Sequence, residues 1–165
     1  MKWTFFIIFL LLTSKISFSQ EHSIHPVKYI FDPNANAKRE LDSVIAVAGK
    51  EHKRILVLVG GDWSVNCMDF NEMLRKVYLQ KILQDSYVFL RINFSPGNKN
   101  EEALKQIDCP RYDGYPQLVV LDETGKKIHA QGVEEFKIDV HLYFGPKMEK
   151  WLGIWASPDA SAKKK

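Results

Sequence analysis

The stretch Ile55–Leu74 constrains the fold more than any other part of this 165-residue chain. A continuous apolar run, Ile55–Val59, ends at Gly60-Gly61, which is typical of a strand buried on both faces. Ser64 is a favourable helix N-cap. The apolar residues after it recur at roughly helical spacing: Val65, Met68, Phe70, Met73, Leu74 and Val77. The sequence therefore predicts a buried strand, a tight turn and a helix that contains Cys67.

The rest of the chain alternates between strand and helix patterns. Before the central strand we expect an amphipathic helix from about Ala35 to Glu51, and Val27–Phe31 is a candidate edge strand. The helix that contains Cys67 is expected to reach about Leu79, with an extension or a second turn up to Gln84. The later elements are expected at Tyr87–Asn93 (strand), from Asn98 or Asn100 to Ile107 (helix), at Leu118–Leu121 and Lys127–Gln131 (hairpin strands), and from near Pro146 to Trp155 (helix). This order predicts an α/β fold with a mixed sheet and helices on both faces.

Two motifs resemble the thioredoxin superfamily. The junction reads Trp63-Ser64-Val65-Asn66-Cys67, where the family has Trp-Cys-x-x-Cys, and Gly114-Tyr115-Pro116 precedes an apolar strand and an Asp-Glu-Thr-Gly hairpin turn. The resemblance covers residues 34–156 and implies a thioredoxin fold, with a central mixed sheet flanked by helices on both faces and an extra N-terminal helix. The segment Phe31–Ala37 and a last helix that ends near Trp155 are most similar to secreted bacterial thioredoxin-like proteins.

The resemblance also implies a degenerate Ser-x-x-Cys active site. Ser64 stands where the family has its nucleophilic cysteine, and a hydroxyl stays protonated near neutral pH without a general base. Leu58 stands where thioredoxin proper has a buried aspartate. Ser64 is therefore expected to be a helix N-cap with no catalytic activity. Cys67 is either a buried core residue, which we favour, or the single reactive thiol of a monothiol redox enzyme.

A binding groove is the second implication of the resemblance. In the family the proline of the tripeptide is cis and faces the active-site turn, and the preceding residue presents its backbone to a bound peptide. Carried over, Trp63, Tyr115 and Pro116 would bind an extended protein segment, although the two aromatic side chains could also shield the core. The function hypotheses are a binding module, a monothiol redox enzyme that uses Cys67, and an oxidoreductase variant that has lost its nucleophile.

The N-terminus is predicted to be a secretory signal peptide covering residues 1–19. Lys2 precedes an apolar run, Trp3–Leu12, and small residues, Ser17 and Ser19, lie at −3 and −1 of a cleavage site after Ser19. A membrane anchor is the weaker alternative, because Lys15 interrupts the run and a span needs about 20 apolar residues. We therefore expect a secreted or periplasmic protein without stable membrane insertion after cleavage. Residues 20–33 are expected to be a lead-in, and residues 157–165 a disordered basic tail.

The net charge, Cys109 and the histidines bear on which further classes of function the chain can have. Loss of residues 1–19 removes two lysines and no acid, which lowers the formal net charge from +3 to +1, and no basic stripe favours nucleic-acid binding. Cys109 lies before Pro110 and away from the family's redox positions. Its expected separation from Cys67 exceeds the reach of a disulfide, about 7 Å between Cα atoms. The five histidines have no metal-ligand spacing, so we expect neither a metal nor a cofactor: His22, His25, His52, His129 and His141.

Overall fold

The structure is a computed structural model that describes residues 28–110 and 114–156. The predicted signal peptide, the first part of the predicted lead-in and the predicted basic tail lie outside the described residues. In the described part, no helix is both long and apolar enough to cross a membrane.

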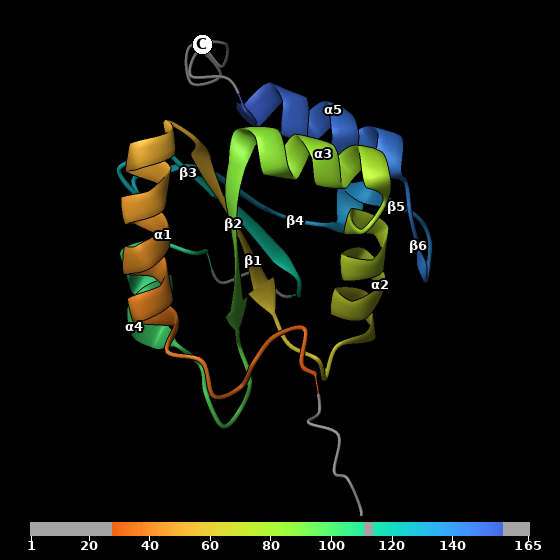
Figure 1. Cartoon of the computed structure of the whole chain (residues 1–165). Coiled ribbons are helices and arrows are strands. Elements are labelled where there is room, and N and C mark those ends of the chain that lie inside the picture. Colours follow the sequence, from red (N-terminus) through yellow and green to blue (C-terminus); the bar gives the residue numbers. More distant parts are fainter. Residues whose placement is uncertain (1–27, 111–113, 157–165) are drawn as a thin grey trace, which may run out of the picture.

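A four-stranded mixed sheet forms the centre of the molecule, with the order β2–β1–β3–β4 (Figure 1). Its strands are β1 (Arg54–Gly60), β2 (Tyr87–Asn93), β3 (Gln117–Leu121) and β4 (Lys127–Gly132). β1 runs parallel to β2 and antiparallel to β3, and β3 pairs with β4 in the predicted hairpin. The predicted mixed sheet is therefore confirmed.

Helices cover both faces of the sheet (Figure 1). On one face lie α1 (Ala37–Glu51) and α4 (Glu101–Gln106), and on the other lie α2 (Val65–Leu74), α3 (Val77–Ser86) and α5 (Gly145–Ala156). Side chains of β1 alternate between two buried clusters, with Val57 in the cluster beneath α1 and Leu56 and Leu58 in the cluster beneath α2. This double burial explains why β1 reads as an uninterrupted apolar run.

The helix that contains Cys67 is shorter than predicted. It ends at Leu74, and a second helix, α3, begins at Val77. The break lies at Lys76, whose ψ of 133° is extended rather than helical. The Gln80 side chain donates from Nε2 to the Leu74 carbonyl at 2.9 Å, which satisfies one of the acceptors freed at the end of α2.

The proposed edge strand at Val27–Phe31 is wrong for its described residues, which form no strand. The backbone N–H groups of Ile30 and Phe31 instead donate to the two carboxylate oxygens of Asp62, each at 3.0 Å. Because a side chain satisfies these donors, the segment needs no neighbouring strand.

Between β4 and α5 the chain forms a small hairpin that the sequence patterns did not predict. It consists of a 3₁₀ turn (Glu134–Phe136), β5 (Lys137–Asp139) and β6 (Leu142–Tyr143). The hairpin contributes the buried ring of Tyr143, which contacts Phe70 of α2 edge to face, with 5.1 Å between centroids. It therefore covers part of the cluster beneath α2.

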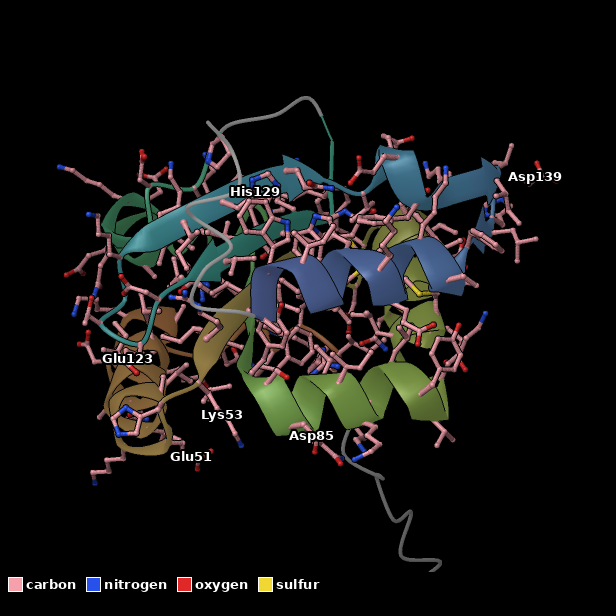
Figure 2. The ribbon with its side chains drawn as sticks, turned by 90° about the horizontal axis from the view of Figure 1, so that it is seen from above. Glu51, Lys53, Asp85, Glu123, His129 and Asp139 are labelled. Carbon is pink, nitrogen blue, oxygen red and sulfur yellow. The ribbon has the colours of Figure 1, made fainter. Side chains whose placement is uncertain are left out.

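Aromatic and polar contacts fasten α5 to the edge strand β4. Figure 2, the view from above, shows α3 and α5 side by side and places His129 on β4. The His129 ring stacks on Trp155 with centroids 4.1 Å apart, and the Trp151 indole N–H donates to the Gln131 side-chain oxygen at 2.9 Å. These contacts hold α5 against one face of β4.

Candidate functional site

The predicted junction lies at the N-terminus of α2. Ser64 is the N-cap, with extended backbone angles (φ −104°, ψ 116°), and its hydroxyl accepts from the Cys67 backbone N–H at 3.4 Å. The N-cap role expected for Ser64 is therefore what the structure shows. The Ser64 hydroxyl oxygen satisfies one of the first N–H groups of α2, which have no acceptor within the helix.

Cys67 lies one turn into α2 with its side chain fully buried. A Cβ placed on Gly60 would lie 2.6 Å from the Cys67 Sγ and 3.1 Å from the Phe31 ring, so both side chains pack where Gly60 has none. Burial raises the pKa of the Cys67 thiol above its ordinary value, and the charge of Asp62 adds to this, while hydrogen bonds with Ser64 and Gly61 oppose it. A thiol in these surroundings is protonated near neutral pH, which favours the core interpretation.

Three aromatic side chains from separate parts of the sequence meet beside this turn. Trp63 is 57% exposed, yet its indole N–H donates to the Phe94 carbonyl at 2.7 Å. The half-buried Tyr115 ring packs edge to face against Trp63 at 5.8 Å and stacks on Phe94 at 4.8 Å between centroids. Gly61 has to lack a side chain here, because a Cβ would clash with the Trp63 indole and lie 3.0 Å from the Phe94 carbonyl oxygen. Trp63 is thus both exposed and fixed in position.

Tyr115 and Pro116 lead directly into β3. The Tyr115–Pro116 peptide bond is cis, and Pro116 itself is buried. The buried Gln117 side chain donates from Nε2 to the Gly114 carbonyl, which holds the approach to the proline. Of the three residues predicted to bind a peptide, Trp63 and Tyr115 therefore offer side-chain surface.

Cys109 lies apart from this arrangement, in the cluster beneath α1 and α4, whereas Cys67 lies in the cluster beneath α2. Both thiols are free. Burial raises the pKa of the half-buried Cys109 to about 11. Among the described residues, no three His, Cys, Asp or Glu side chains are grouped so that they could hold a metal ion.

Sequence reasoning missed two residues that organise the site. Asp62 fixes the segment before α1 to the turn, and Phe94 supplies both the carbonyl that holds Trp63 and the ring that supports Tyr115. Phe94 directly follows β2, which runs parallel to β1 and ends at the same edge of the sheet. That parallel pairing was the available signal, because residues that follow neighbouring parallel strands lie close together.

Comparisons with known proteins agree with this geometry. The sequence model of the thioredoxin-like domain matches residues 41–138, more than half of the chain. A disulphide isomerase from Xylella fastidiosa Temecula1 has a similar structure, with a TM-score of 0.68, 19% identity and coverage of 77% of this chain and 96% of that one. An oxidoreductase called DsbH gives a TM-score of 0.54 at 17% identity, covering 92% of this chain and 96% of its own. Among curated proteins, none matches significantly.

The chain belongs to the thioredoxin-like family, and its described part has the thioredoxin fold. Its structural neighbours include the disulphide isomerase and the oxidoreductase named above. A thioredoxin-fold protein from Helicobacter pylori is also similar, with a TM-score of 0.51, 16% identity and coverage of 69% of this chain and 75% of that one. At these identities the structural similarity concerns the fold alone.

Proposed function

We propose that this protein is an extracytoplasmic binding module that holds an extended protein segment at Trp63, Tyr115 and Pro116 without exchanging disulfides. The observation that carries the proposal is the contrast between two neighbouring residues. Trp63 is 57% exposed and fixed by a hydrogen bond, whereas Cys67 is fully buried. The turn thus presents a rigid aromatic surface and keeps its thiol out of reach.

The aromatic surface fits a polypeptide better than a small polar ligand. Large exposed aromatic side chains are typical anchors of protein interfaces, because they bury much apolar area and lose little side-chain entropy when already fixed. A hollow of about 470 Å³ also reaches Tyr115, and its lining combines apolar side chains such as Phe94 and Leu104 with charged ones such as Lys99 and Asp108. A bound segment could place one apolar side chain against Trp63 and another in this hollow.

The substitution at the nucleophile position supports binding over redox catalysis. The Ser64 hydroxyl is the N-cap of α2, where it accepts from the Cys67 backbone N–H at 3.4 Å. The raised pKa of Cys67 leaves little thiolate to attack a disulfide near neutral pH. The site therefore keeps the family's groove and lacks its exchange chemistry.

Titration of the mature protein with an S-carbamidomethylated insulin B chain tests binding, because the probe has no thiol or disulfide to exchange. We expect saturable binding in a calorimeter, weakened at least about tenfold by Trp63→Ala. Gly61→Ala should weaken binding as well, because it displaces the Trp63 indole without removing it.

Val77→Ala is the matched control, because Val77 is 85% exposed and lies at the start of α3, beyond the far end of α2. Equal affinities for the protein, Trp63→Ala and Val77→Ala would refute the proposed groove.

The extracytoplasmic location rests on the leader pattern of residues 1–19. Mass spectrometry of the protein purified from cells should identify Gln20 as the first residue. A protein that keeps Met1 and stays in the cytoplasmic fraction would contradict this part of the proposal.

A further inference from the structure

The segment before α1 passes beside the turn between β1 and α2, which contains Asp62 and Trp63. Figure 1 shows it passing below the lower ends of β1 and β2 to reach the loop between β1 and α2. There the Asp62 carboxylate accepts one hydrogen bond from the Ile30 N–H and one from the Phe31 N–H, both at 3.0 Å. Asp62 immediately precedes Trp63, so a residue of the candidate site fastens a segment about thirty positions earlier in the chain.

The Phe31 side chain is inserted beside the thiol. Phe31 is 1% exposed, and it belongs to the same buried cluster as Cys67. Its ring and the Cys67 Sγ approach the same side of Gly60, at 3.1 and 2.6 Å from the position of an added Cβ. Phe31 and Cys67 therefore pack beside each other within this cluster.

Few backbone hydrogen bonds hold Ile30 and Phe31 in place. Residues 28–36 form neither helix nor strand, and within the described part of the chain the N–H groups of Ile30 and Phe31 donate to Asp62. The next anchors lie further along, where the Asn98 amide donates to the carbonyls of Pro33 at 2.9 Å and Ala35 at 3.3 Å. Because its backbone lies outside the sheet, such a segment can open locally while the sheet stays intact, at the cost of uncovering the buried Phe31 ring.

We propose that Ile30 and Phe31 form a latch, closed by Asp62, that controls access to the Cys67 thiol. In the closed state the Phe31 ring covers Cys67, and release of the Asp62 hydrogen bonds withdraws the ring and exposes the thiol. The inference goes beyond the proposed peptide groove and does not depend on it, because it concerns the thiol and not Trp63.

Alkylation by N-ethylmaleimide, followed by mass spectrometry, measures the opening directly. In the native protein Cys67 reacts only through opening, and its rate is proportional to the population of the open state. Cys109 serves as a reference within the same sample, because it is half-buried and packs against the other cluster, away from Phe31 and Asp62. Local opening changes the Cys67 rate and leaves the Cys109 rate and the free energy of unfolding in urea unchanged, whereas global destabilisation lowers that free energy.

Asp62→Asn should raise the Cys67 rate about tenfold or more, because an NH2 group replaces one of the two oxygens that accept from Ile30 and Phe31, and because the charge that strengthens such bonds is lost. Asp85→Asn is the matched control, because the Asp85 carboxylate pairs with Lys81 at the surface of α3. It should leave the Cys67 rate unchanged.

Phe31→Ala separates opening from electrostatics, since the charge of Asp62 also acts on the Cys67 thiol. The latch predicts that Phe31→Ala accelerates Cys67 as well, with Cys109 unchanged. If only Asp62→Asn raised the alkylation rate of Cys67, the increase would come from the lost charge, and the latch would be overturned. Unchanged Cys67 rates in both variants, or parallel increases at Cys67 and Cys109, would overturn it too.

Discussion

Replacing Gly60 by alanine should destabilise the protein, although alanine is normally preferred to glycine within a strand. The added methyl group would meet the Cys67 Sγ at 2.6 Å and the Phe31 ring at 3.1 Å, and both of these side chains are fully buried. Overpacking of this kind costs about 1–3 kcal/mol. The backbone preference for alanine offsets about 0.5–1 kcal/mol of this, which leaves a net loss of up to about 2.5 kcal/mol.

A second substitution shows whether Cys67 causes the loss. Cys67→Ala alone removes one buried heavy atom and should cost about 1 kcal/mol. In the double variant the alanine at position 60 occupies part of the space that the sulfur leaves. The loss of unfolding free energy in the double variant should therefore be smaller than the sum of the losses in the two single variants, by about 1–2 kcal/mol.

Urea unfolding followed by tryptophan fluorescence gives the four free energies of unfolding that this cycle needs. Gly153→Ala is the matched control, because a Cβ at that exposed position of α5 meets nothing within 4 Å. It should stabilise the protein by about 0.5–1 kcal/mol. Losses at Gly60 and Cys67 that add within about 0.5 kcal/mol would refute the packing argument.

Two further predictions concern buried hydroxyl and thiol groups. Tyr87→Phe should lower the free energy of unfolding by about 1–2 kcal/mol, because the Tyr87 hydroxyl donates to the Leu152 carbonyl at 2.6 Å. Tyr143→Phe should cost little, because the buried Tyr143 hydroxyl has no hydrogen-bond partner among the described residues, and equal losses in urea unfolding would contradict this. The free energy of unfolding should also fall as the pH rises from about 8.5 toward 11. In the unfolded chain the thiols ionise with a pKa of about 8.5, whereas burial raises the pKa of Cys67 and Cys109 and keeps both thiols protonated in the folded state. Cys109→Ala should flatten this decline, and an unchanged slope would count against it.

The sequence predicted the sheet and its helices well, because their signals are local. The run Ile55–Val59 is buried on both faces, and the alternating segment at 87–93 became β2 with the predicted bounds. The break between α2 and α3 escaped prediction because it depends on one extended residue, Lys76, between two segments that both favour helix. The β5–β6 hairpin is too short, at three and two residues, to show a clear period.

The site could be predicted only where residues follow one another. Ser64 as an N-cap and Cys67 one turn later follow from their spacing, and the structure shows both. Asp62 meets Phe31, and Trp63 meets Phe94, through hydrogen bonds between residues about thirty positions apart, and no local pattern encodes such contacts. The candidate edge strand at 27–31 failed for the same reason, since a distant carboxylate replaces its strand partner.

Insulin reduction in the presence of dithiothreitol, with the protein and its Ser64→Cys variant side by side, tests most directly whether this site binds without exchanging disulfides. The account predicts no acceleration by the protein itself, because Ser64 caps α2 and Cys67 is buried with a raised pKa. It predicts acceleration by Ser64→Cys, which places a thiol at the helix N-terminus where its pKa falls. Acceleration by the unaltered protein that disappears in Cys67→Ala would contradict the account and establish Cys67 as a working thiol.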